Sequence, residues 1–146
     1  MPRKPVIAVN ADTFKDSHGI ITGVRSPYWK AVVAAGGIPV LLPDMDSEAD
    51  LRTFLAMADG LVLTGGDDLR PERVGESLHP RADPITRSRD RADFGLIDII
   101  LETRMPALAI CLGFQELNIH CGGTIWQDLE DENPRAIPHR GRGKMK

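Results

Sequence analysis

The sequence predicts an α/β domain in which helices cover a mostly parallel sheet. Short apolar runs typical of strands occur at 6–9, 38–42, 61–63 and 108–110, and stretches of helical periodicity separate them. Strands that alternate with helices favour a parallel sheet with both faces covered. The chain has 146 residues, of which 42% are hydrophobic and 27% charged, so it is long enough to bury the core of one domain.

The first strand leads into residues 10–25, which we expect to form a polar loop. A helix should follow, with Ser26 as its N-cap and Pro27 at its first helical position. The glycine pair at 36–37 is expected to end that helix, because glycine is the preferred residue just past a helix C-terminus.

After the second strand, residues 47–50 resemble a capping box with aspartate in place of glutamate, which predicts a helix to about Ala58. The third strand ends at a glycine pair. Residues 67–87 are polar and contain three prolines, so we expect a long surface loop, and loops of that length are often functional. Helical spacing resumes around Ser88.

The fourth strand ends abruptly at Cys111, and a glycine follows two residues later. A helical pattern over 112–121 begins at once, and 124–126 is expected to be a short strand. Strand, sharp turn and helix are the layout of a nucleophile elbow, which holds a reactive group clear of the backbone. The helix N-terminus favours negative charge and so helps to stabilise a thiolate. The small residues Ala109 and Gly113 leave room for the crossing.

Composition excludes several other classes of protein. The net charge of −3 and the dispersed basic residues give no reason to expect nucleic acid, and no apolar stretch approaches the ~20 residues that span a bilayer. The N-terminus leads into a strand rather than a signal-peptide core, so we expect a cytoplasmic protein. Cys111 and Cys121 should lie about 15 Å apart on one helix, too far for a disulfide. No second Cys or His pair stands at ligand spacing beside Cys121, so we expect no metal.

Four co-linear segments point to a known family. Cys111-Leu112-Gly113-Phe114-Gln115 resembles the Cys-x-Gly-x-Gln signature of class I glutamine amidotransferases. Residues 61–68 resemble their glycine-rich oxyanion strand, Arg89-Asp90 the segment before the elbow, and 122–129 the stretch after it. Together they are most similar to the γ-glutamyl-γ-aminobutyrate hydrolase branch, the peptidase C26 group. The resemblance implies a flavodoxin-like three-layer sandwich.

The resemblance also implies a site and a reaction. Cys111 would attack a small-molecule γ-glutamyl amide, and no cofactor would be needed. The N–H groups of Gly66 and Leu112 would form the oxyanion hole. Gln115 and Gly65 would contact substrate. The alternatives are a buried structural cysteine, a plain strand-to-loop turn, and an exposed helix residue at Gln115.

The sequence departs from the family pattern in two places near the site. Ala109 stands where the family usually has glycine, and Asp67 where relatives often carry a third glycine. Alanine is small enough to keep the turn. Asp67 leaves the choice between Gly65 and Gly66 as the oxyanion donor open.

The resemblance places the family's catalytic histidine and its carboxylate in a C-terminal segment beyond the matched region. His120 should lie about 13 Å along the helix from Cys111, too far to act as base. His18, His79 and His139 match no family position. We therefore expect residues 1–129 to form a partial domain, with its C-terminal part missing.

Residues 130–146 are expected to form an irregular polar tail. The chain as given should hydrolyse γ-glutamyl amides very poorly, because its thiol lacks a positioned base. The alternative function is a non-catalytic pseudoenzyme, or a domain that binds a small ligand or a partner. Oligomeric state stays open.

Overall fold

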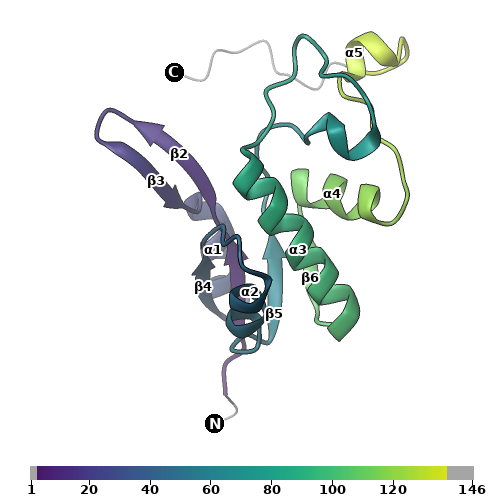
Figure 1. Cartoon of the computed structure of the whole chain (residues 1–146). Coiled ribbons are helices and arrows are strands. Elements are labelled where there is room, and N and C mark those ends of the chain that lie inside the picture. The colour runs from purple at the N-terminus through teal and green to yellow at the C-terminus, as the bar shows by residue number, and fades with distance from the viewer. Residues whose placement is uncertain (1–2, 138–146) are drawn as a thin grey trace.

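A computed structural model describes residues 3–137, and its centre is a four-stranded parallel sheet of order β4-β1-β5-β6 (Figure 1). The strands are β1 (Val6–Asn10), β4 (Ile38–Leu42), β5 (Gly60–Leu63) and β6 (Ala107–Ala109). In the register of the sheet, Val9 pairs with Leu41 and Val62, and Leu63 pairs with Ala109. The parallel sheet predicted from the sequence is confirmed, with every strand within one residue of its predicted bounds.

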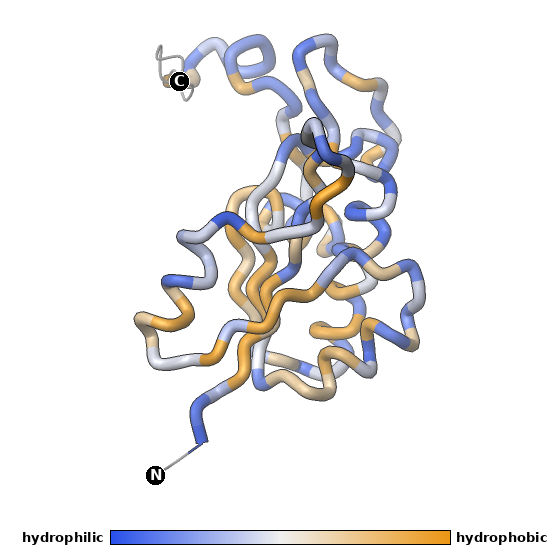
Figure 2. Tube along the Cα trace, turned by 90° about the vertical axis from the view of Figure 1, so that its left-hand side faces the viewer, coloured by the Kyte–Doolittle hydropathy of each residue, from blue (hydrophilic) through white to orange (hydrophobic). Residues whose placement is uncertain are grey.

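Helices cover both faces of this sheet. The helix α1 (Ser26–Ala34) packs its buried Val32 on Val9 and Val62. On the opposite face α2 (Glu48–Leu55) and α3 (Arg87–Thr103) pack against Ala8, Leu61 and Leu63, and α4 (Leu112–His120) lies beside α3. The strands therefore carry the most hydrophobic part of the chain into the interior (Figure 2). The three-layer α/β arrangement agrees with the flavodoxin-like fold class.

The face of the sheet beside α1 is open next to β6. A mostly apolar depression of about 590 Å³ lies there, lined among others by Ile7, Tyr28, Val62 and Ile110. Leu108 in the middle of β6 is 59% exposed. Within residues 3–137, β6 has β5 as its one strand neighbour, so it is an edge strand.

The expectation of a polar loop over residues 10–25 is wrong. Most of that stretch is an antiparallel hairpin of β2 (Asp12–Asp16) and β3 (Gly19–Gly23), which projects from the sheet (Figure 1). Ile20 and Ile21 are exposed, and the strands show no clean alternation of buried and exposed positions. Strand pairing, rather than burial of one face, holds the ribbon, so the usual hydrophobic signal of a strand is missing.

Several helix ends differ from their sequence predictions. Arg25, not Ser26, is the N-cap of α1, and Ser26 is the first helical residue. This puts Pro27 at the second helical position instead of the first, and proline is tolerated throughout the first turn of a helix. Ser47 does cap α2, by accepting a hydrogen bond from the Asp50 N–H, but that helix ends at Leu55.

The segments before α3 and after α4 also differ from expectation. The 67–87 loop contains one 3₁₀ turn, η1 (Pro71–Val74), and residues 124–126 are not a strand. A single helical turn, α5 (Leu129–Glu132), runs into the stretch expected to be irregular. None of the helices in the described residues is both long and apolar enough to cross a membrane.

Candidate active site

Cys111 occupies a strained turn between β6 and α4. Its backbone has φ 52° and ψ −109°, a region that non-glycine residues rarely enter, and the residue is exposed and free of disulfide. Strain of this kind persists where the surroundings fix it, and it clusters at functional sites. The elbow predicted from the sequence is therefore present in the backbone.

The C-terminal end of β5 holds the elbow in place through backbone hydrogen bonds. The Ile110 N–H donates to the Leu63 carbonyl at 3.0 Å, and the Gly113 N–H lies 3.3 Å from the Thr64 carbonyl. A Cβ on Gly113 would lie 2.6 Å from the Leu63 Cβ and 2.8 Å from the Leu63 carbonyl oxygen. Only glycine allows this close approach of helix and strand.

The glycine pair after β5 lies against the elbow. A Cβ on Gly65 would be 3.3 Å from the Cys111 Cβ, and one on Gly66 would be 2.8 Å from the Leu112 Cδ2. The Gly65 N–H donates to the Tyr28 hydroxyl at 3.0 Å. In the described part of the chain no hydrogen bond engages the N–H of Gly66 or Leu112. The structure thus brings together four of the five site residues predicted from the sequence.

The fifth, Gln115, lies one turn further along α4, where its N–H donates to the Cys111 carbonyl at 3.0 Å. It is half-buried and lines a groove of about 400 Å³ together with Phe114, Trp126 and Asp68. The groove connects the first turn of α4 to the segment before α5.

Acidic side chains surround the turn that follows the glycine pair. Partial burial raises the pKa of Asp67, and the negative charges of Asp83, Asp12 and Asp68 raise it further. The residue directly after the glycine pair is therefore an acid with a weakened tendency to ionise.

A buried polar network behind the glycine pair could not be read from spacing. Arg89 is 1% exposed and its guanidinium is bonded to Asp93, one turn away on α3. Asn10 donates to Asp93 at 2.7 Å, and Glu116 on α4 is fully buried beside them. The family resemblance includes Arg89 only as part of a matched segment, and the apolar spacing of α3 does not predict that two charged side chains are buried.

Burial and mutual repulsion control ionisation in this network. Burial, with the negative charge of Asp93 adding to it, raises the pKa of Glu116 to about 10. Burial also raises the pKa of Asp93, while Arg89 opposes that change. At neutral pH Glu116 is therefore a neutral acid beside the Arg89–Asp93 ion pair.

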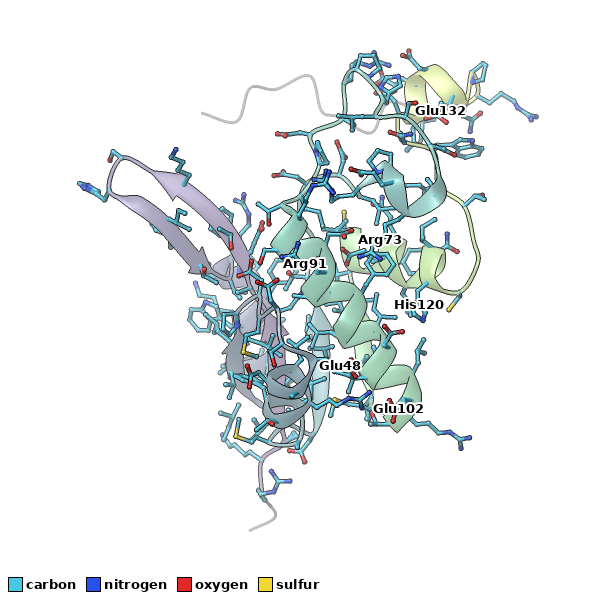
Figure 3. All side chains as sticks on the ribbon, in the orientation of Figure 1. Glu48, Arg73, Arg91, Glu102, His120 and Glu132 are labelled. Carbon is cyan, nitrogen blue, oxygen red and sulfur yellow. The ribbon has the colours of Figure 1, made fainter. Side chains whose placement is uncertain are left out.

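Two of the described histidines, His79 and His120, pair with carboxylates away from Cys111. His120 projects from the far end of α4 (Figure 3). Its Nε2 lies 3.5 Å from Asp98, and the Nε2 of His79 lies 3.3 Å from Asp131. His18 is in the turn between β2 and β3, and His139 falls outside the described residues. Within residues 3–137 there is no group of three His, Cys, Asp or Glu side chains arranged to hold a metal ion.

A strand-to-helix elbow with a cysteine at its tip, on a three-layer parallel sheet, defines the class of cysteine-elbow α/β proteins. The Peptidase C26 family model matches residues 5–145, nearly the whole chain. The chain therefore belongs to the Peptidase C26 family.

Curated relatives cover most of this chain. It is 36% identical over 120 residues to the Escherichia coli K12 gamma-glutamyl-gamma-aminobutyrate hydrolase PuuD, covering 80% of this chain and 46% of that protein. It is 31% identical over 128 residues to Protein NtpR of Enterococcus hirae, covering 88% and 52%. It is 32% identical over 138 residues to "Putative glutamine amidotransferase PB2B2.05" of Schizosaccharomyces pombe, covering 93% and 49%. The chain spans about half the length of these relatives.

Proposed function

We propose that this chain carries the nucleophile of a cysteine-dependent hydrolase of γ-glutamyl amide bonds. The observation that supports it most is the exposed Cys111 at φ 52°, beside the N–H groups of Gly66 and Leu112, which no hydrogen bond engages within residues 3–137. The name of the E. coli relative, a γ-glutamyl amide hydrolase, supports the same reaction.

The proposed reaction has two steps. The Cys111 thiolate attacks the side-chain amide carbonyl of the substrate, and the N–H groups of Gly66 and Leu112 stabilise the tetrahedral oxyanion. The C–N bond breaks, the amine leaves with the proton that the general base took from the Cys111 thiol, and a thioester remains on Cys111. Water then attacks the thioester, which releases the γ-carboxylate and returns the thiol.

The geometry favours Gly66 over Gly65 as the second donor. The Gly65 N–H donates to the Tyr28 hydroxyl, whereas that of Gly66 makes no hydrogen bond to any residue that the structure describes. We assign Gly65 to the substrate-facing wall, where the absence of a side chain leaves room next to Cys111. Gln115, at the start of the groove, would bind the glutamyl part of the substrate.

The general base is proposed to come from the part of the relatives that this chain does not span. His79 and His120 are paired with Asp131 and Asp98, and neither pairs with Cys111. The 146-residue chain should therefore show very slow turnover, and Cys111→Ala should remove what remains. Rapid hydrolysis by this chain would contradict that assignment and would place the base within it.

Covalent labelling tests the nucleophile without requiring turnover. A diazoketone analogue of glutamine should label Cys111 at least about tenfold faster than Cys121, the ratio that 1.4 kcal/mol of glutamyl recognition produces. Intact mass and peptide mapping identify the labelled thiol, and free glutamine should slow the reaction. Iodoacetamide, which has no glutamyl part, is the control for exposure, because both cysteines are exposed. Equal labelling of both by the analogue would refute the proposal.

A further inference from the structure

Thr64, the residue between β5 and the glycine pair, is a buried junction of hydrogen bonds. It is 2% exposed, and its N–H donates to the Asn10 Oδ1 at 2.6 Å. Its hydroxyl lies 3.2 Å from the Asn10 carbonyl oxygen and 3.1 Å from the Arg89 Nη2, which donates to it. Its carbonyl oxygen faces the Gly113 N–H of the elbow. One residue thus connects the turn that holds Gly66 to the turn that holds Cys111.

Arg89 is fixed in place on several sides. Its Nε donates to Asp93, its Nη1 lies 3.3 Å from the Asp12 Oδ1, and its Nη2 reaches Thr64. Asn10 holds the other carboxylate oxygen of Asp93. The guanidinium is planar and rigid, so its orientation is transmitted to the Thr64 hydroxyl.

A buried ion pair is often no more stabilising than apolar residues of similar volume. Glu116 adds a second buried acid to this cluster beside Asp93, and it is neutral at pH 7, so it can face Asp93 without a second negative charge. The polar contacts converge on the residue before the glycine pair rather than on the apolar core.

We propose that Arg89 and Thr64 are positioning residues that set the direction of the Gly66 N–H relative to Cys111. Arg89 acts through the Thr64 hydroxyl, and Thr64 acts through its own backbone. The inference rests on the proposed function, because the orientation of Gly66 matters for chemistry only if its N–H binds the oxyanion.

The test removes one hydroxyl and keeps the shape of the side chain. Thr64→Val deletes the acceptor for Arg89, and Thr64→Ser restores it. We expect Thr64→Val to shift the ¹⁵N–¹H resonances of Gly65 and Gly66. It should also slow labelling of Cys111 by the glutamine-like diazoketone about tenfold, less than the loss on deleting an oxyanion donor outright. Iodoacetamide labelling of Cys121 in the same sample should not change.

Two further variants separate positioning from general loss of structure. Arg89→Lys keeps the charge without the three-way geometry and should behave like Thr64→Val. Arg73→Met also removes an ion pair to α3, between Arg73 and Asp90 at 2.7 Å. Because this pair does not involve Thr64, the variant should change neither the Gly65 and Gly66 resonances nor the rate of Cys111 labelling.

The outcomes distinguish the two proposals. Unchanged Gly65 and Gly66 resonances in folded Thr64→Val overturn the positioning role, whatever Cys111 does. The same holds if Thr64→Ser fails to restore them. Absence of selective labelling in the unmodified chain, with the resonance shifts present, refutes the proposed function and leaves the positioning of the turn established.

Discussion

Helix α4 carries a free, exposed cysteine at each end, and the two ends differ in almost everything else. Cys111 precedes the first helical residue with φ 52° and ψ −109°. Cys121 caps the C-terminus with φ −80° and ψ 8°, an ordinary conformation. The two cysteines share residue type, exposure and helix. The backbone around each thiol is what distinguishes a candidate nucleophile from an ordinary surface cysteine.

The surroundings repeat that contrast. At the first end, the Gly65–Gly66 turn and the Leu112 N–H lie beside the thiol. At the second end, the Cys121 N–H closes the last turn on the Leu117 carbonyl at 3.0 Å. Helix geometry explains the difference, because the first turn leaves N–H groups free to bind a ligand and the last turn leaves carbonyl oxygens. A cysteine at the C-terminal end has no donors to offer an oxyanion.

The largest expected difference comes from the same substitution made at each end. Gly113→Ala should lower the free energy of unfolding by about 3 kcal/mol, the upper range for overpacking, because its Cβ would meet the Leu63 backbone. Gly122→Ala should cost about 1 kcal/mol, since that site is open and only its φ of 85° is strained. Urea unfolding measures both. Equal losses would mean that the elbow is no more tightly packed than the other end.

A second comparison uses two ionisable side chains of α4, the buried Glu116 and the partly exposed His120. Burial raises the pKa of Glu116 from its ordinary value of 4.5 to about 10 in the folded chain. Between these two pH values the folded chain therefore keeps a proton on Glu116 that the unfolded chain has already lost. The free energy of unfolding should therefore fall as the pH rises across that window, by about 1.4 kcal/mol per pH unit at most for one proton. Glu116→Gln mimics the protonated acid and should flatten the slope.

Urea unfolding between pH 6 and 9 checks this dependence. His120→Gln, at the far end of the same helix, is the control, and the slope should persist in it because Glu116 is still present. Asp93 faces Glu116 from α3, and Arg89, Asp90 and Asp12 are the other charges near the pair. An undiminished slope in Glu116→Gln would assign the effect to another of these groups.

The smallest expected effects have opposite signs at the two ends. Cys111→Gly relieves the strain of a positive φ and should stabilise the chain by about 1 kcal/mol, while abolishing labelling by the glutamine analogue. Cys121→Gly adds backbone freedom at an unstrained position and should destabilise it by about 0.5 kcal/mol. Thermal unfolding of both variants measures the difference. A loss of stability in Cys111→Gly would show that the elbow is not strained.

The elbow could be predicted because its signals are local. A strand, a cysteine, a glycine two residues on and a helical pattern all lie between positions 107 and 121, and each is a property of neighbouring residues. The hairpin at 12–23 could not be predicted by the same reasoning, because an exposed ribbon has no buried face to impose alternation. Whether Ser26 or Arg25 caps α1 depended on a shift of one residue that Pro27 tolerates equally.

The sequence by itself determined the parallel α/β arrangement, the family resemblance and the position of Cys111 at a strand-to-helix turn. The tertiary structure alone decided which glycine N–H is open, because Tyr28 binds Gly65 across 37 positions of the chain. It also assembled the network behind the turn, in which Asn10 and Asp93 lie 83 positions apart. Periodicity and propensity report on neighbours along the chain, whereas a buried polar group must find its partner wherever packing brings one.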